Sequence, residues 1–327
     1  MEVPSSFAKA YEDAEKELLN NLPPWGKASA AQRVKLLLYW LTVAFPIVLL
    51  QALVISSCLI YLKYYLLPLL VYTDERPDLY YYHSSEEFEI AQVKGTAAAT
   101  ILSICLLLFQ LSHLQAILVH PGRIPADSLW EIHSDSDSEP EDSDDLFVER
   151  RRDGSRRTCS MCQRKKPDRT HHCKQCEECV LQMDHHCNWI GNCVGFFNFK
   201  YFFLMVFYGT LMTVLYLATF WETVLVVLND VDTSLGAASL AVAYYSFLLV
   251  LGVALLSFLG LHLWMITRNY STIEYCEKKR HNAVQYQQSP FDKGCFHNWQ
   301  NALGQRYCLW LLPVNSRLPE ESGLFYC

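Results

Sequence analysis

Long apolar stretches separated by shorter polar segments dominate the pattern along this chain. Four of them exceed the roughly 20 apolar residues that a helix needs to cross a bilayer. They cover approximately residues 34–61, 95–119, 201–228 and 239–267. Trp, Tyr and Lys cluster at several of their ends, as interfacial anchors do. A further apolar run at 64–72 contains Pro68 and either extends the first stretch or lies at the interface. The pattern predicts four transmembrane helices.

The distribution of Lys and Arg predicts how these helices are oriented. Hydrophobic residues make up 51% of the chain and the net charge is -7, which suits a membrane protein and argues against nucleic-acid binding. Segment 120–200 carries twelve Lys and Arg residues, loop 63–94 carries three and loop 229–238 carries none. Because cytosolic loops carry the excess of basic residues, we expect the central segment and both termini to face the cytosol.

Polar segments flank the predicted helices. Residues 134–145 alternate Ser with Asp and Glu and contain no apolar side chain, so nothing there offsets the entropy of ordering and we expect disorder. Its serines are candidates for phosphorylation, although a solvated linker is the simpler interpretation. The basic run at 150–157 either meets anionic headgroups or balances the acidic neighbour. Residues 1–33 are expected to form a frayed cytosolic segment or a short amphipathic helix.

The densest chemistry lies between Cys159 and Cys193. This stretch holds seven of the 13 cysteines and four of the 11 histidines. Disulfides and tetrahedral zinc sites are the two interpretations. The interleaved histidines and the expected reducing compartment favour zinc. Two closed sites use eight of the eleven groups and leave three for chemistry. Since a saturated tetrahedral site has no open position, we expect both zinc ions to be structural.

The triplet His-His-Cys occurs twice, at residues 171–173 and 185–187. Spacing alone therefore does not say which copy supplies metal ligands and which supplies a free thiol. Asp184 directly precedes the second copy, whereas Thr170 precedes the first. An aspartate there can accept an imidazole N–H and stabilise an imidazolium, as a Cys–His nucleophile pair requires. The second copy is therefore the candidate catalytic one.

These residues belong to a wider pattern. It comprises Cys159-x-x-Cys162, Lys166-Pro167-x-Arg169, His171-His172-Cys173, Met183, Asp184-His185-His186-Cys187 and Asn192-Cys193-Val194-Gly195. The pattern resembles the cysteine-rich domain of the Asp-His-His-Cys (DHHC) protein S-acyltransferases. The resemblance implies that one zinc is bound by Cys159, Cys162, His172 and Cys179, and the other by Cys173, Cys176, His186 and Cys193. It also implies that Cys187 carries the acyl group, with His185 as its base and Asp184 orienting His185.

The resemblance extends beyond the cysteines. Ser271-Thr272-Ile273-Glu274 is similar to the family's Thr-Thr-x-Glu motif, and implies that Thr272 supports Asp184. Asn298 matches the asparagine of a C-terminal motif that packs against the helices. The chain departs from the family at Asn188, where Pro is usual, and at His120-Pro121-Gly122, where the family has Asp-Pro-Gly.

An acyl-CoA donor needs cations for its phosphates and an apolar cavity for its chain. By resemblance and position, the candidate phosphate contacts are Lys166, Arg169 and His171. Trp189 is expected near the thiol, and Met212 near the far end of the acyl cavity.

We predict an all-α polytopic membrane protein, with four transmembrane helices and a cytosolic zinc-binding cysteine-rich domain between the second and third. The expected segments are 1–33 (cytosolic), 34–119 (helices 1 and 2), 120–158 (linker), 159–200 (zinc-binding catalytic domain), 201–267 (helices 3 and 4) and 268–327 (cytosolic). The expected function is ping-pong transfer of palmitoyl from acyl-CoA to cysteines of membrane-associated proteins. A Golgi or endoplasmic reticulum membrane is expected rather than the plasma membrane.

Two other classes of function compete with this prediction. A membrane-anchored zinc module would bind partners without chemistry, and the presence of Asp184, His185 and Cys187 argues against it. A zinc hydrolase would need an open coordination position, which the number of ligands does not leave.

Overall fold

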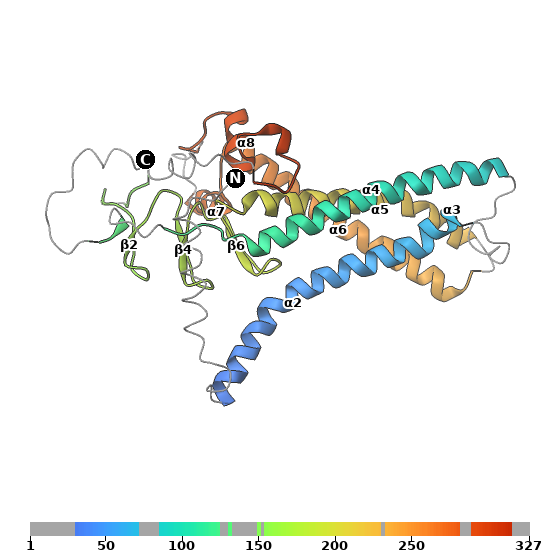
Figure 1. Cartoon of the computed structure of the whole chain (residues 1–327), viewed down its shortest axis with the longest axis horizontal. Helices are drawn as coiled ribbons and strands as arrows, with labels where there is room; N and C mark the ends of the chain where they lie inside the picture. Colours follow the sequence, from blue (N-terminus) through green and yellow to red (C-terminus); the bar gives the residue numbers. More distant parts are fainter. Residues whose placement is uncertain are drawn as a thin grey trace.

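Four long helices make up most of the computed structural model (Figure 1). It describes residues 30–71, 85–124, 130–132, 149–151, 154–229, 233–281 and 289–315. Helix α2 covers Ala30–Tyr61 and continues through a π-helical turn, η1 (Leu62–Leu66), into α3 (Leu67–Leu70); α4 covers Ser85–Leu118, α5 Phe199–Asn229 and α6 Leu235–Arg268. By length and composition, Leu41–Leu70, Glu86–Leu118, Phe199–Asn229 and Leu235–Arg268 can each cross a membrane. The prediction of four such helices is confirmed.

Two helix boundaries differ from the sequence prediction. The apolar run that begins at residue 64 extends the first helix as far as Leu70, and Pro68 is tolerated because it lies in the first turn of α3, where its missing N–H is not needed. Helix α4 begins at Ser85 rather than at Gly95. Its first turn carries Glu86 and Glu87, which suit a helix N-terminus but lower the hydropathy from which the start was predicted.

Helix α5 lies between α4 and α6 and contributes the largest share of the buried apolar cluster. Polar side chains link the helices inside this cluster. The Tyr61 hydroxyl lies 2.6 Å from the Thr219 hydroxyl, and the Tyr244 hydroxyl donates to the Ser57 carbonyl at 3.2 Å. Such bonds hold helices together where no water competes for the polar groups.

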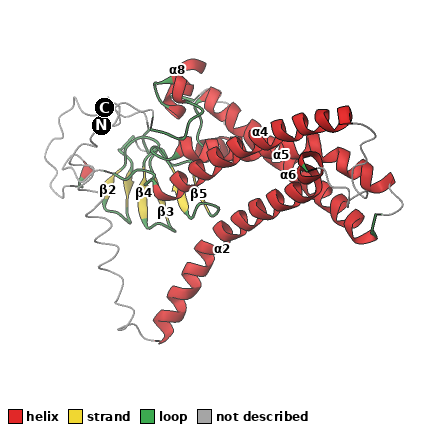
Figure 2. Ribbon diagram, turned by 45° about the vertical axis from the view of Figure 1, so that its right-hand side comes forward, coloured by secondary structure: helices red, strands yellow, loops and turns green. Residues whose placement is uncertain are grey.

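Three short β-hairpins come one after another between α4 and α5. Their strands are β1 (Thr158–Cys159), β2 (Arg164–Lys165), β3 (His171–Cys173), β4 (Glu178–Val180), β5 (His185–Cys187) and β6 (Asn192–Val194). Each hairpin is a separate two-stranded antiparallel sheet. Figures 1 and 2 show them in a row that leads toward the helices, with β5–β6 at the helix ends. So little sheet buries only two small apolar clusters, and the row needs another source of stability.

The C-terminal segment packs back on the helix ends. It contains α7 (Thr272–His281), α8 (Cys295–Leu303) and the 3-10 turn η5 (Tyr307–Leu309). Buried Lys200 on α5 donates through Nζ to the carbonyls of Leu309 and Val314, at 2.8 and 2.9 Å. Asn298 on α8 is 2% exposed and donates to the Thr267 carbonyl at the end of α6, at 3.0 Å. The predicted linker at 134–145 and most of the segment 1–33 lie outside the described residues.

Candidate functional site

A repeat of 14 residues underlies the three hairpins. Cys159, Cys173 and Cys187 occupy the same position in successive hairpins, directly before the loop that joins the two strands. Gln163, Glu177 and Gly191, again 14 apart, all have positive φ in that loop (52°, 57° and 59°). The sequence contained this signal, which analysis of the cysteine spacing alone missed.

Two sets of four side chains converge as the resemblance implied. They are Cys159, Cys162, His172 and Cys179, and Cys173, Cys176, His186 and Cys193; within each set the ligand atoms lie within 4.8 Å of one another. Each set combines the cysteine pair of one hairpin loop with a cross-strand His–Cys pair of the next hairpin, such as His172 opposite Cys179. Because adjacent residues of a strand point to opposite faces, His172 and Cys173 join different sets.

The geometry of both sets fits a tetrahedral metal. His186 Nδ1 lies 3.6, 3.4 and 3.5 Å from the sulfurs of Cys173, Cys176 and Cys193. Zinc with nitrogen at about 2.0 Å and sulfur at about 2.3 Å places such atoms about 3.5 Å apart. His172 Nδ1 lies 3.3 Å from the Cys162 sulfur and 3.9 Å from that of Cys179. Each set can therefore hold a metal ion through three sulfurs and one imidazole nitrogen.

Cys187 lies outside both sets. In its hairpin the second loop cysteine is replaced by Ile190, which is fully buried. Helix α5 comes after β6 in place of a fourth hairpin, so the chain brings this thiol no further cross-strand His–Cys pair. Cys187 is 6% exposed and belongs to the same buried apolar cluster as the helices. The third hairpin thus presents its cysteine to the end of the helical bundle.

His185 and Asp184 lie beside this thiol. His185 Nδ1 lies 2.7 Å from Asp184 Oδ2, and the His185 ring packs edge-on against Phe202 of α5, with 5.0 Å between centroids. Burial alone lowers the pKa of His185, but hydrogen bonds with Asp184 and Cys187 outweigh it and raise the pKa to about 9. Such an imidazole readily holds a proton, as a group that deprotonates a thiol must.

The N-terminus of α7 holds Asp184, which is 2% exposed. Thr272 donates its backbone N–H to Asp184 Oδ1 at 2.8 Å and its hydroxyl to Oδ2 at 2.7 Å. Burial alone raises the pKa of Asp184, yet hydrogen bonds from His185 and Thr272 hold it below the ordinary value. Ser271 and Glu274 form a reciprocal capping box that fixes this helix end, with bonds of 2.9 and 3.2 Å.

Arg169 has partners that the sequence prediction did not foresee. Its guanidinium donates to both carboxylate oxygens of Glu274 at 2.7 and 2.9 Å and to Asn269 Oδ1 at 2.8 Å, and its side chain is 8% exposed. A bidentate, buried pair of this kind ties the hairpins to the segment after α6. Arg169 thus forms a structural link to a residue 105 positions further along the chain, and the expected phosphate contact stays a prediction.

Four other residues are expected to contact the acyl-CoA donor: Lys166, His171, Trp189 and Met212. Lys166 is half-buried in the loop after β2. Burial, with help from Arg157, Lys166 and Arg169, lowers the pKa of His171 to about 4, so this imidazole is neutral and would meet a phosphate as a hydrogen-bond donor, not as a cation. Trp189 is 46% exposed beside Cys187, and Met212 is buried on α5 in the same apolar cluster as Cys187.

The two departures from the family pattern have different structural consequences. His120 Nδ1 accepts the N–H of Gly122 at 3.0 Å, so the imidazole closes this turn by a side-chain bond of the kind that an aspartate can also form. Asn188 is exposed, and its carbonyl accepts the N–H of Gly191 at 3.3 Å. The tight turn after Cys187 therefore persists without proline.

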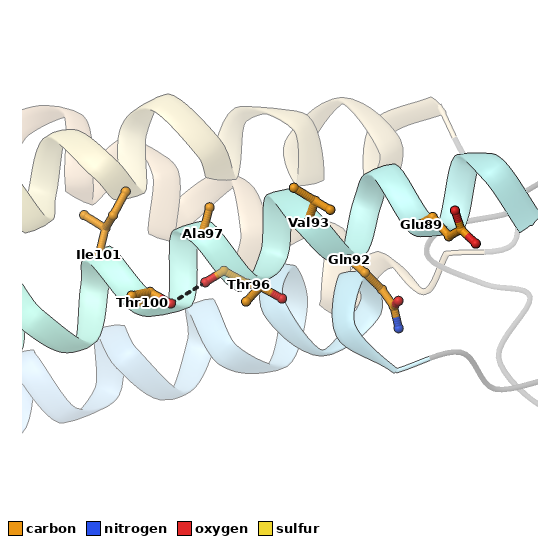
Figure 3. A pocket seen from close by; sticks show the side chains of 7 residues that line it. All are labelled: Glu89, Gln92, Val93, Thr96, Ala97, Thr100 and Ile101. Atoms are coloured by element: carbon orange, nitrogen blue, oxygen red, sulfur yellow. Dashed lines mark hydrogen bonds between the residues drawn. The ribbon is translucent and has the colours of Figure 1, made fainter.

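A surface hollow on α4 is separate from this site (Figure 3). It is lined by Glu89, Gln92, Val93, Thr96, Ala97, Thr100 and Ile101. The Thr100 hydroxyl is used within the helix, where it donates to the Thr96 carbonyl at 2.8 Å. The hollow lies in the first half of α4, whereas the third hairpin meets the helix at its other end through Asn192, which donates to the carbonyls of Ala116, Ile117 and Val119 at 3.1 to 3.3 Å.

Comparisons with known proteins agree with the site. A family model described as DHHC palmitoyltransferase matches residues 152–279. Probable protein S-acyltransferase 15 of Arabidopsis thaliana is 33% identical over 236 residues, covering 69% of this chain and 85% of that protein. Probable protein S-acyltransferase 14 of the same plant is 34% identical over 248 residues, covering 70% and 78%. Palmitoyltransferase ZDHHC20 of Bos taurus is 43% identical over 169 residues, covering 49% and 44%. The site and these relatives together establish that the chain belongs to the DHHC palmitoyltransferase family.

Proposed function

We propose that this membrane protein transfers a long-chain acyl group, such as palmitoyl, from acyl-CoA to cysteine thiols of membrane-associated proteins. One observation carries the proposal. Of the cysteines at the repeated hairpin position, Cys187 alone lies outside both metal-binding sets, and it lies beside His185, Asp184 and Thr272. A free thiol next to an oriented imidazole is the arrangement of an activated cysteine nucleophile.

In the first half-reaction, the Cys187 thiol gives its proton to His185. The thiolate then attacks the thioester carbonyl of acyl-CoA, and a bond forms between the Cys187 sulfur and the acyl carbon. As the tetrahedral intermediate collapses, the bond to the CoA sulfur breaks and CoA leaves with the proton that His185 held. Asp184, held by Thr272, stabilises the transient imidazolium.

In the second half-reaction, a substrate cysteine attacks the acyl-enzyme. Its thiol proton passes to His185, its sulfur bonds to the acyl carbon, and the Cys187 thiolate leaves and regains the proton. Both the donor and the intermediate are thioesters, so little energy separates them and the acyl group remains activated. This ping-pong scheme requires one thiol and one base, and His185 is the base in both directions.

The two metal-binding sets would hold structural zinc. Bound zinc would supply folding free energy here, and four protein ligands in each set would leave it no position for a substrate. Cys159, Cys162, His172 and Cys179 hold the first hairpin to the second. Cys173, Cys176, His186 and Cys193 hold the second to the third. Because His186 is adjacent to His185, the second set also fixes the strand on which the base stands.

The position of the thiol suits a donor with a charged head and an apolar tail. Cys187 lies at the junction of the hairpins and the helical bundle, close to the start of α5 at Phe199. Lys166 and His171 are proposed to contact CoA, and Trp189 and Met212 to line the path of the acyl chain. Each methylene that the chain buries contributes about 0.8 kcal/mol.

The charge distribution supports a cytosolic location for the catalytic segment. The twelve basic residues between 120 and 200 favour placing that segment, with both termini, on the cytosolic side, where acyl-CoA and reduced cysteines are found. The segments 1–33, 120–158 and 268–327 would then be cytosolic, 159–200 the catalytic domain, and 34–119 and 201–267 the membrane part. We propose a Golgi or endoplasmic reticulum membrane.

Single-turnover labelling tests the proposal. Purified full-length protein with radiolabelled palmitoyl-CoA should take up one hydroxylamine-sensitive label and release it to an added peptide thiol. Cys187→Ser should take up none. A folded, zinc-loaded wild type that takes no label would contradict the proposed activity.

A further inference from the structure

Three polar side chains meet inside the membrane-spanning part of the bundle, close to the catalytic hairpin. Gln51 lies on α2, and Gln110 and His113 lie on α4, all within segments able to cross a membrane. His113 is 2% exposed. Polar and ionisable groups at such depth are costly unless they are paired, and they commonly serve function. This cluster therefore requires an explanation beyond helix packing.

The hydrogen bonds of the cluster run in one direction. Gln110 Nε2 donates to Gln51 Oε1 at 2.9 Å. Gln51 Nε2 lies 2.7 Å from His113 Nδ1, and His113 Nε2 lies 3.1 Å from the carbonyl oxygen of Trp189. An amide nitrogen only donates and a carbonyl only accepts. His113 must then accept at Nδ1 and donate from Nε2. The two glutamines thus select the tautomer with its proton on Nε2, which donates to the carbonyl oxygen of Trp189.

The carbonyl that accepts this hydrogen bond, that of Trp189, belongs to the catalytic turn. The peptide unit between Trp189 and Ile190 is planar, so its carbonyl and its N–H are oriented together. The Ile190 N–H donates to the carbonyl of Cys187 at 3.2 Å. One rigid peptide plane thus links His113 on one side to the backbone of the nucleophile on the other.

Helix α2 also touches this turn directly. Gly191 has a φ of +59°, and a Cβ added there would lie 3.0 Å from Val43 Cγ1 and 3.2 Å from Ile47 Cδ1. Val43, Ile47 and Gln51 are spaced four apart and lie on one face of α2. The same face therefore packs against the turn and supplies the amide that orients His113.

The corresponding turns in the first two hairpins are held differently. There, residues 159–162 and 173–176 carry a pair of cysteines that can hold a metal. The third hairpin has Ile190 at the second cysteine position, and exposed Asn188 instead of the proline usual in the family. The turn at 187–191 thus has neither a pair of cysteines that can hold a metal nor a proline. Instead, His113 of α4 donates a hydrogen bond to its backbone.

We propose that His113 is a positioning residue for acyl transfer: through its Nε2–H bond to the Trp189 carbonyl, it holds the turn that sets the direction of the Cys187 thiol. The inference rests on the proposed function of Cys187. It assigns to Gln51 and Gln110 the task of fixing the tautomer of His113.

The test compares full-length His113→Leu, His113→Gln and Gln115→Leu in single-turnover labelling with palmitoyl-CoA. His113→Leu removes the donor. His113→Gln keeps an N–H donor of similar reach and lacks the imidazole. Gln115→Leu is the matched control, since Gln115 on the same helix also donates to a backbone carbonyl, that of Pro313, outside the catalytic turn.

We expect the substitution of His113 to change the maximal rate and to leave the apparent affinity for palmitoyl-CoA unchanged. His113→Leu should lower the maximal rate of acyl-enzyme formation roughly 10- to 100-fold, since small misplacements of a reacting group have effects of this size. The palmitoyl-CoA concentration at half-maximal rate and the zinc content should stay close to wild type. His113→Gln should recover the rate to within about threefold of wild type, and Gln115→Leu should not slow it, because only the bond to Trp189 matters.

Two results would overturn the inference while wild-type labelling leaves the proposed function intact. One is a wild-type rate in His113→Leu. The other is a rate in His113→Gln as low as in His113→Leu, which would assign the effect to packing or to the imidazole itself. If His113→Leu does not fold, Gln51→Leu decides: it should lower the rate about threefold or more with zinc retained, and an unchanged rate would refute the inference. Absence of label in the wild type would refute the proposed function instead.

Discussion

The hairpins β3–β4 and β5–β6 carry the same triplet, His-His-Cys, in the same register, and they differ in the use of the third residue. His172 lies opposite Cys179, and His186 lies opposite Cys193. Both pairs belong to metal-binding sets. Cys173 faces a following hairpin and joins the second set, whereas Cys187 faces the helices and joins none. A metal-ligating cysteine and the cysteine proposed as the nucleophile thus occupy equivalent positions, and the neighbouring element in space distinguishes them.

The residues before the triplets reinforce this difference. Asp184 orients His185 and is itself held by Thr272, whereas Thr170 stands before the first triplet. His171, the counterpart of His185, has a pKa lowered to about 4, first by burial and then by neighbouring cations. The first histidine of the first triplet, His171, therefore favours the neutral form, whereas His185 favours the protonated form. Only His185 is basic enough to take the proton of a thiol.

The largest expected effect comes from removing a metal ligand. Cys176→Ala should reduce the bound zinc from two ions per chain to one and expose the hairpins to proteolysis, because a structural zinc contributes on the order of 10 kcal/mol to folding. Ile190→Ala changes the corresponding residue of the third hairpin and should keep both zinc ions. Elemental analysis with limited proteolysis measures this. Equal zinc loss in the two variants would contradict the assignment of ligands.

The next effect separates the two first histidines. His185→Ala should lower the rate of acyl-enzyme formation roughly 10³-fold or more, as loss of a base in such a constellation does. His171→Ala should instead raise the half-saturating palmitoyl-CoA concentration by at most about tenfold, because a lost binding contact changes affinity and leaves the rate. Single-turnover kinetics over a range of donor concentrations distinguishes them. Similar losses of maximal rate would make both histidines catalytic.

A smaller effect is expected at Thr272. Thr272→Val removes the hydroxyl that donates to Asp184 Oδ2 at 2.7 Å, and a hydrogen bond to a charged group contributes about 1.5–3 kcal/mol. The rate should fall roughly 10- to 100-fold. Thr272→Ser keeps the hydroxyl and should stay within a few fold of wild type. If the serine variant were as slow as the valine variant, the methyl group and not the hydrogen bond would support Asp184.

The smallest expected effect concerns the apolar cluster that Cys187 of the third hairpin shares with the helices. Met212→Trp adds volume to a buried position on α5 and should shift the preferred donor toward shorter acyl-CoAs by a few fold, with zinc content unchanged. Competition between myristoyl-, palmitoyl- and stearoyl-CoA measures the shift. Leu211→Trp, at the neighbouring residue that is 40% exposed, is the control. An unchanged preference in Met212→Trp would remove Met212 from the acyl path.

The sequence predicted the parts of this molecule that depend on local, repeated patterns. Long apolar runs located the four helices, and the spacing of Cys and His, with the family resemblance, indicated both ligand sets before any geometry was known. Contacts between distant segments were not predictable in this way. Arg169 was expected at a phosphate because its charge is evident, but its carboxylate partner Glu274 lies 105 residues away. His113 attracted no attention in an apolar run, since its partners come from two other segments.

The most direct test of the account treats the two equivalent cysteines alike. Cys173→Ser and Cys187→Ser should be purified as full-length protein, and zinc per chain and hydroxylamine-sensitive palmitoyl label measured on the same samples. The account predicts that Cys187→Ser keeps two zinc ions and takes no label, while Cys173→Ser loses zinc. Label on Cys187→Ser equal to wild type, or zinc loss in Cys187→Ser, would contradict the claim that Cys187 is the free nucleophile.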